Sequence, residues 1–419
     1  NVGGGYNSSY GMNSLKSNTS GNYNVAMGYE ALQANTSGTS NTAVGMYSGK
    51  FNTTGQGITA IGYSALNANT TASYNTAVGY QALTSNTTGG QNVAVGFQAL
   101  TDNTTGPSNT AVGQYALANN TTGGGNNALG YHSLETSTTG SSNNAFGESA
   151  LRYATTASSN SAFGNQALTS TTTGTLNTAV GAGAGSAITT GQNNTVVGGS
   201  AGGISTGTNN TSIGIYTMGG ATTTGDQNTA VGYAGLFELT SGQNNTALGF
   251  DSGRATSPSG SLTTASNRIV LGNSSVTHAY IKVAWTVTSD ARDKTDFTPL
   301  DLGLDFVKGL KPITYKWDMR SNYGDTEADD YDLAAQTPDG THKEDWLDIG
   351  FKAQDVEALE IAAGYTKDNN TNLLSSHTED GNSMGLKYDK FVPILVKAIQ
   401  EQQTLIEALT SRIQTLEGE

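Results

Sequence analysis

The sequence predicts a mainly β protein, in which a repetitive β-solenoid of 17-residue coils is followed by a small α+β domain ending in a coiled-coil helix. Three observations support this prediction. A glycine recurs every 17 residues through residues 1–255, the composition changes from nearly uncharged to charged near residue 289, and residues 391–417 carry a heptad pattern. We therefore expect a solenoid at 1–255, a β neck at 256–288 and a C-terminal domain at 289–419.

The repeat has the consensus N-T-A-V-G-Y-x-A-L-x-x-N-T-T-G-x-x. Its first glycine, which we call the coil glycine, follows an Asn by four residues in fourteen of fifteen copies, with Ile58 as the exception. A Leu is common four residues after it and gives way to Gly in four copies (Gly49, Gly185, Gly202 and Gly253). The coil glycines are Gly11, Gly28, Gly45, Gly62, Gly79, Gly96, Gly113, Gly130, Gly147, Gly164, Gly181, Gly198, Gly214, Gly232 and Gly249.

Each Asn-Thr-Thr-Gly predicts a turn, and each Thr-Ala-Val predicts a short strand. One repeat then makes one coil, and stacked coils place Asn on Asn and Val on Val, so that amide ladders satisfy their own hydrogen bonds. A disordered low-complexity tract is the alternative, but disorder does not require a strict period.

Lateral association of several chains is expected for this array. One coil holds only about three or four sizeable apolar residues, a small core against the entropy of ordering a whole coil. Adjacent Ala and Val also place apolar side chains on both sides of each strand. The simplest arrangement is a homotrimeric fibre.

The array offers no enzyme chemistry. Its seven carboxylates do not recur in register, which argues against a glycosidase pair, and the repeat lacks the Asp that calcium-binding β-roll repeats carry in every turn. His132 is expected to be a surface substitution at a variable position. The repeats resemble the left-handed β-roll repeats of trimeric adhesin heads, which share an Asn-Ser/Thr-x-Ala-Ile/Val-Gly core, and repeats of phage tail fibres.

Composition excludes further classes of protein. Without cysteine the chain has neither disulfides nor thiolate metal sites, and no cofactor or metal is expected. The net charge is −14, and without a basic patch the chain is a poor nucleic-acid binder. No apolar run has the ~20 residues of a membrane helix, so no membrane insertion of this segment is expected. The chain opens with Asn1 rather than Met, which is typical of a fragment or a processed product.

Beyond the array, alternation and β-branched content predict strands in the neck, and the C-terminal domain mixes helices and strands. The expected elements are neck strands at 268–272 and 279–287, a helix at 300–310, strands at 312–317 and 349–353, an acidic surface loop at 320–348 and a helix from Phe391 to the end.

The last helix carries apolar residues in steps of three and four, with Gln402 as the one polar residue of the seam. Ile and Leu at such positions favour a two-stranded over a three-stranded coiled coil. The seam therefore predicts self-association but does not determine the number of chains. The seam residues are Val392, Leu395, Ile399, Ile406, Leu409, Ile413 and Leu416.

Four motifs follow one another from residue 289 onwards: Ser289-Asp-x-Arg-x-Lys294, L-K-P-I-T-Y-K-W at 310–317, G-F-K-A-Q-D-V at 350–356, and Y-D-K-F-V-P-I-L-V-K-A-I-Q-E at 388–401. Together they resemble the C-terminal intramolecular chaperone domain of endosialidases and phage tail fibres. The resemblance implies a domain that trimerises the fibre, assists its folding, and then removes itself by cutting before the motif serine.

On this chain the resemblance places the scissile bond between Thr288 and Ser289. The Ser289 hydroxyl attacks the Thr288 carbonyl, Lys294 is the expected base or cation, and Asp290 is expected to orient the lysine or the amide. The alternative is that Ser289 caps a turn while Asp290 and Lys294 form an ordinary i,i+4 ion pair. The sequence differs from the family pattern at one place. The family has Asn and an aliphatic residue soon after the Lys, whereas this chain has Thr-Asp-Phe at 295–297.

We therefore expect a structural, receptor-binding homotrimer like a phage tail fibre, carried on the virion, acting extracellularly and assembled in the host cytoplasm. Its partners would be its own copies and a host-surface glycan or protein receptor. Enzyme activity would be limited to a self-cleaving serine autopeptidase.

The alternatives are a cell-surface trimeric adhesin with the same assembly domain, a glycan-degrading spike, or an ice-binding solenoid. The last is suggested by a row of Thr three residues before the coil glycine, which other residues interrupt at Val25, Val93, Asn127 and Asn144.

Overall fold

The computed structural model describes residues 4–220, 222–282, 287–324, 331–368, 371, 373–378 and 381–418. It divides into two compact units. The first, which we call the solenoid, comprises Asn1–Arg254 and Leu262–Gly272. The second, the C-terminal unit, comprises Ala255–Ser261 and Asn273–Glu419.

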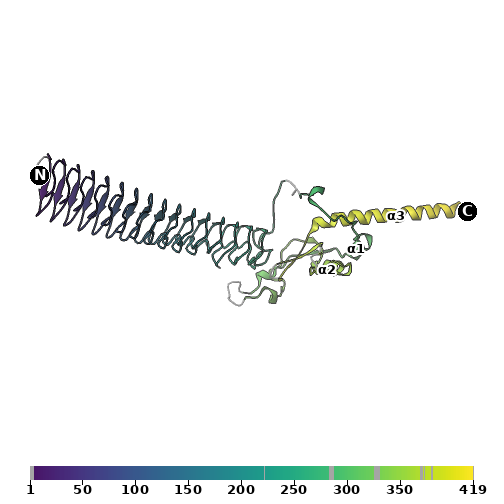
Figure 1. Ribbon diagram of the computed structural model, residues 1–419. Helices are drawn as coiled ribbons and strands as arrows, with labels where there is room; N and C mark the ends of the chain where they lie inside the picture. Colours follow the sequence, from purple (N-terminus) through teal and green to yellow (C-terminus); the bar gives the residue numbers. More distant parts are fainter. Residues whose placement is uncertain are drawn as a thin grey trace. The chain divides into compact units, whose positions relative to one another are not determined.

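The solenoid is a single parallel sheet of sixteen three-residue strands that follow one another in chain order, one strand per coil (Figure 1). Pairing is in register, so that Thr76, Ala77 and Val78 lie beside Val93, Ala94 and Val95. The β-solenoid expected from the repeat is therefore confirmed. The strands are β1 Ser8–Tyr10, β2 Val25–Met27, β3 Thr42–Val44, β4 Thr59–Ile61, β5 Thr76–Val78, β6 Val93–Val95, β7 Thr110–Val112, β8 Asn127–Leu129, β9 Asn144–Phe146, β10 Ser161–Phe163, β11 Thr178–Val180, β12 Thr195–Val197, β13 Thr211–Ile213, β14 Thr229–Val231, β15 Thr246–Leu248 and β16 Ile269–Leu271.

The coil glycine is needed both for its backbone angle and for its lack of a side chain. The fifteen coil glycines have φ between 113° and 141°, a region that L-residues with a side chain rarely adopt. A Cβ on Gly96 would lie 2.5 Å from the carbonyl oxygen of Gly113 in the next coil. The glycine therefore lets two neighbouring backbones approach at every strand end.

In a typical coil the core consists of the strand Ala and an Ala-Leu pair five and six residues later, as in Ala77, Ala82 and Leu83, all fully buried. The Leu adopts a left-handed backbone conformation, as in Leu83 with φ 53°. Such a conformation costs a non-glycine residue roughly 1–2 kcal/mol, and burying the side chain contributes about 1.5–3 kcal/mol. Burial therefore offsets the backbone strain and closes the turn.

Where glycine replaces this Leu, an isoleucine from another position fills the space in two coils. A Cβ on Gly49 would lie 3.5 Å from Cδ1 of Ile58, the one residue that interrupts the Asn row. A Cβ on Gly185 would lie 3.2 Å from Cδ1 of Ile188. The exceptions to the consensus thus compensate each other in packing.

Two ladders of buried asparagines run along the solenoid, which confirms the predicted stacking of amides. In the first ladder, Asn92 donates its backbone N–H to Oδ1 of Asn75 and its Nδ2 to the carbonyl of Gly106, both at 2.9 Å. In the second, each amide nitrogen donates to the Oδ1 of the preceding coil at 2.7–3.1 Å. The second ladder comprises Asn18, Asn35, Asn52, Asn69, Asn86, Asn103 and Asn120.

The second ladder ends at Asn120 because the next coil has Ser137 at the equivalent position. The serine is too short to continue the chain of hydrogen bonds, and both Asn120 Oδ1 and Ser137 Oγ are buried without a partner. A buried polar atom without a partner costs about 1–3 kcal/mol.

Two expectations about the solenoid need correction. The strand in 268–272, assigned to a neck, is β16, which pairs with β15 and makes the sheet longer than the sequence repeat. His132 is not a surface residue, because only 9% of it is exposed; its ring stacks on Tyr115 and its Nδ1 lies 2.8 Å from Glu135.

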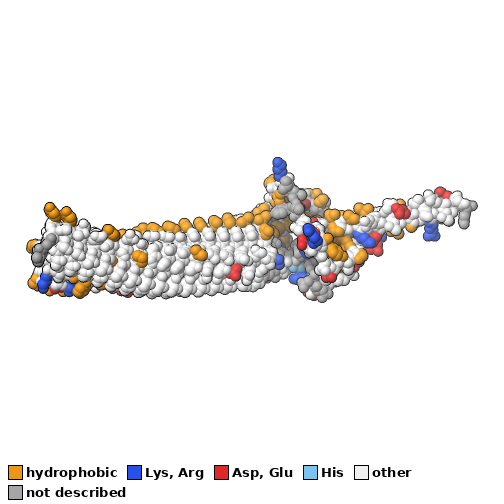
Figure 2. Space-filling model, turned by 45° about the horizontal axis from the view of Figure 1, so that its top comes forward, with side chains coloured by type: hydrophobic (Ala, Val, Ile, Leu, Met, Phe, Trp, Pro, Cys, Tyr) orange, Lys and Arg blue, Asp and Glu red, His pale blue; other side chains and the backbone are white. Residues whose placement is uncertain are grey.

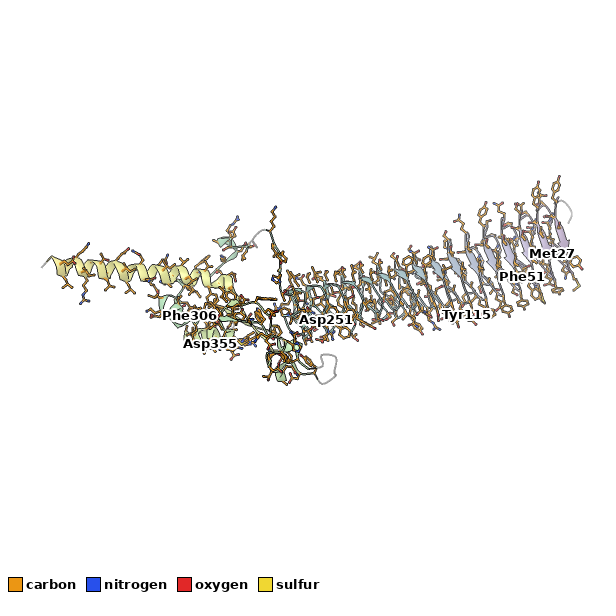
Figure 3. All side chains as sticks on the ribbon, turned by 180° about the vertical axis from the view of Figure 1, so that it is seen from behind. Met27, Phe51, Tyr115, Asp251, Phe306 and Asp355 are labelled. Atoms are coloured by element: carbon orange, nitrogen blue, oxygen red, sulfur yellow. The ribbon has the colours of Figure 1, made fainter. Side chains whose placement is uncertain are left out.

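The described residues of the C-terminal unit form three helices and two small antiparallel sheets. Its core includes Leu302, Phe306, Val356, Phe391 and Ile394, and Figure 3 labels Phe306 among these elements. The elements are α1 Leu304–Gly309, β17 Ile313–Tyr315, β18 Asp348–Gly350, α2 Ala353–Ala362, β19 Ser375–His377, β20 Met384–Leu386 and α3 Phe391–Glu417, with 3-10 turns at Ala291–Asp293, Arg320–Asn322, Leu333–Ala335 and Tyr388–Lys390.

Most of these elements were predicted from the sequence, but not all of their first and last residues. The first helix begins at Leu304 after Gly303 rather than at residue 300, and the strand expected at 349–353 ends at Gly350, where α2 soon begins. Residues 283–286 of the expected strand 279–287 lie outside the described residues, and the described remainder is not a strand. Neither α2 nor the β19–β20 hairpin was predicted. The burial of Glu360 explains why, since its carboxylate accepts the N–H groups of Leu373, Leu374 and Ser375, and a buried acid obscures the apolar pattern of α2.

Replacing a coil glycine should destabilise the solenoid strongly. Gly96→Ala combines an unfavourable φ with a clash against the next coil, and we expect a loss of about 2 kcal/mol or more in the apparent free energy of unfolding. Gly199→Ala is the matched control, because a Cβ there meets nothing within 4 Å. Guanidinium unfolding followed by circular dichroism measures both variants, and equal midpoints would contradict this account of the coil glycine.

Extending the second ladder should stabilise the solenoid. Ser137→Asn gives Asn120 Oδ1 a donor, for an expected gain of about 1 kcal/mol in the free energy of unfolding. Ser137→Ala removes the unpartnered hydroxyl without supplying a donor, so its gain should be smaller. Thermal melting of the full chain compares them, and an alanine variant as stable as the asparagine variant would argue against the ladder.

Candidate active site

The residues predicted for self-cleavage surround a short 3-10 turn, Ala291–Asp293. Asp290 caps this turn by accepting the backbone N–H of Arg292 at 2.9 Å. Asp is favoured at such a position because its side chain bonds to backbone N–H groups that the turn leaves free. The turn brings Lys294 back toward Ser289.

The structure brings together two of the three predicted residues. Lys294 Nζ lies 2.6 Å from Ser289 Oγ, a charge-assisted hydrogen-bond distance, and 3.4 Å from the carbonyl oxygen of Ser289. A nucleophilic hydroxyl and an amine in contact are the arrangement that a serine–lysine mechanism requires. The alternative in which Lys294 pairs with Asp290 is not the one observed, because the lysine binds the serine instead.

Asp290 has a different partner from the one expected. Its carboxylate makes a two-oxygen contact with the Arg292 guanidinium, with distances of 2.6 Å and 3.1 Å. The side-chain and backbone hydrogen bonds from Arg292 lower the pKa of Asp290. Asp290 therefore stays ionised and holds the arginine and the turn, rather than orienting Lys294.

Arg292 had no predicted role, although it lies two residues after a capping acid, a spacing that allows this contact. Its side chain is largely exposed in the single chain, as are those of Ser289 and Lys294. In the arrangement described, the amine of Lys294 lies beside the Ser289 hydroxyl, and both side chains are open to solvent in one chain.

The terminal helix α3 has two parts. Its first turns are anchored in the core by Phe391, Ile394 and Ala398, and Glu401 accepts the N–H of Leu304 at 2.7 Å, a contact that lowers the pKa of the Glu401 carboxyl. In Figures 1 and 3 the rest of α3 extends beyond the described neighbouring elements of its unit. All seven apolar seam residues are between 43% and 66% exposed. The heptad helix is present as expected, and its seam is uncovered in one chain.

An apolar groove of about 900 Å³ lies at the small sheet β17–β18 and is lined by residues 312–314, 349–351 and Tyr388. None of Thr288, Ser289, Asp290 or Lys294 lines it. Among the described helices, none has the length and apolar character needed to cross a membrane.

Residues 289–365 match the family model described as the chaperone of endosialidase. The match begins at Ser289 itself. The match contains the first three motifs and ends before the fourth. It confirms the chaperone domain over residues 289–365, and such a domain suggests a role in folding and trimerisation for the β-solenoid that precedes it. No curated protein matches the sequence. No solved structure matches the chain.

Proposed function

We propose that the chain is a segment of a homotrimeric, receptor-binding fibre of the phage tail fibre type, whose endosialidase-type chaperone domain drives trimerisation and folding and then cleaves the chain between Thr288 and Ser289. The observation that carries the cleavage proposal is the 2.6 Å contact between Ser289 Oγ and Lys294 Nζ, made by the first residue of the family match.

The proposed reaction proceeds through an ester. Ser289 Oγ attacks the carbonyl carbon of Thr288, the C–N bond breaks, and the hydroxyl proton passes to the released amine of Ser289. Water then hydrolyses the ester between Thr288 and Ser289 Oγ, leaving a carboxylate on Thr288 and a free hydroxyl on Ser289. Lys294 assists the attack either as a base, once it is removed from water, or by stabilising the alkoxide.

The assembly role is supported by α3. A row of exposed Ile, Leu and Val at heptad spacing loses contact with water only when it packs against the same row on other copies. A chaperone that holds three chains together at one end fixes their starting register. Cleavage after folding then makes assembly difficult to reverse and gives the fibre kinetic stability.

Receptor binding to a host-surface glycan or protein and a place on the virion complete the proposal. Their support is the combination of a long, nearly uncharged repeat with a chaperone domain of this type. A cell-surface adhesin with the same assembly domain remains the alternative function, and an N-terminal membrane anchor in the full-length protein would favour it.

Freshly expressed protein should yield two fragments, one ending at Thr288 and one beginning at Ser289, and Ser289→Ala should remain at full length. Lys294→Met, which keeps the length of the side chain without its amine, should also abolish cleavage. Asp290→Asn should slow it by about tenfold or less, the effect of roughly 1 kcal/mol on the barrier, because the aspartate acts through the turn. Mass spectrometry of the denatured protein identifies the products, and a wild-type chain that stays whole on prolonged incubation would refute autocleavage.

Charge placed in the seam of α3 should prevent assembly. In the Ser289→Ala background, Ile406→Asp with Leu409→Asp should weaken association at least about 100-fold, because unpaired carboxylates would be buried at a cost of several kcal/mol. Ser411→Asp is the control, since residue 411 lies outside the seam. Sedimentation velocity measures the oligomer, and an intact trimer in the double variant would exclude α3 as a clamp.

A further inference from the structure

The sheet of the solenoid has an outward face that repeats once per coil. Successive side chains of a strand point to opposite sides, and the middle residue of nearly every strand from β2 onward is a buried Ala. The first and third residues therefore point outward. The first is most often Thr, and we call the third residues the apolar row.

The apolar row has no polar interruption in any of the sixteen strands, although it faces outward. Its members are exposed or half-buried in the single chain, and the exposed fraction reaches 39% in Ile61, 45% in Leu129 and 42% in Val180. The row comprises Tyr10, Met27, Val44, Ile61, Val78, Val95, Val112, Leu129, Phe146, Phe163, Val180, Val197, Ile213, Val231, Leu248 and Leu271. Figure 2 shows hydrophobic side chains in a continuous line along one edge of the solenoid.

Charge is confined to another part of the coil. Residues 1–255 hold eleven Lys, Arg, Asp and Glu, and ten of them stand one to six residues after a coil glycine, with Asp226 as the exception. No charged residue occupies the first or third position of any of the sixteen strands. The sheet face is thus uncharged, whereas the segment after the coil glycine carries nearly all of the charge, together with exposed apolar residues such as Tyr63 and Phe97.

We infer that this sheet face is where copies of the solenoid meet, side by side and in parallel, so that equivalent members of the apolar row lie at one level. The inference rests on the proposed homotrimer and assigns it an interface. A second copy is the occupant that fits, because it presents an apolar row with the same period. Parallel alignment follows if α3 of each copy joins the same ends.

The size of the face agrees with this assignment. Fifteen strand spacings of ~4.8 Å and strands of three residues at ~3.3 Å give a face of roughly 700 Å². A stable protein–protein interface buries about 800 Å² per partner. The face is thus close to the area that one partner contributes to a stable interface, and a small ligand would cover only a few coils of it.

Single cysteines test the inference, because the chain has none of its own. Val112→Cys places a thiol in the apolar row, and Thr122→Cys places one on an exposed residue about half a coil away. Cysteine is a small apolar residue, so both variants should fold. With a short bismaleimide, Val112→Cys should give covalent dimers at least about tenfold faster than Thr122→Cys, since thiols at one level have a high effective concentration. Val180→Cys repeats the test four coils further on.

Denaturing gels and sedimentation of the same samples separate the outcomes. Rapid cross-linking of Val112→Cys and Val180→Cys, with slow cross-linking of Thr122→Cys, supports the inference. Equal or slower cross-linking of the apolar-row variants in a sample that sediments as a trimer overturns the interface and leaves the trimer standing. A sample that sediments as a monomer overturns both.

Discussion

The close approach of one coil to the next is the constraint on which the structure depends. The coil glycine allows this approach, because a Cβ would overlap the carbonyl of the following coil. In-register pairing then places equivalent side chains above one another, which is why a buried asparagine is acceptable only as part of a ladder. The break at Ser137 shows the consequence, since one change of residue leaves two polar atoms without partners.

The strict period made the solenoid predictable from the sequence. How the residues that depart from the consensus pack could be seen only in the structure. The Asn and Val rows follow from the period alone. The period gives no sign that Ile58 fills space left by Gly49, because the two residues play different roles in the consensus and meet only through packing. His132 was misjudged for a related reason, since its burial comes from the rings and carboxylate of its own and a neighbouring coil.

In the candidate site, too, residue spacing predicted one contact, whereas another depends on the conformation of the turn. Spacing within the motif predicted that Ser289 and Lys294 belong together, and they are in contact. The partner of Asp290 was not predictable, since residues 292 and 294 both offer a cation and only the shape of the turn selects Arg292. Likewise α2 escaped prediction because its buried Glu360 accepts backbone N–H groups from the segment that leads into β19.

Repetition also explains why such a rod benefits from a chaperone at one end. If copies meet along the apolar row, slipping one copy by a single coil again places an apolar side chain beside an apolar side chain at every remaining level, although few of these pairs are identical residues. The energy difference between correct and slipped pairing is therefore small relative to the whole interface. The coils of 16 and 18 residues after Gly198 and Gly214 keep their strands paired in the sheet. On the sheet face they therefore do little to favour correct pairing of the copies over slipped pairing. A rod of this kind cannot define its own register, and a clamp that aligns the chain ends before the coils associate can do so.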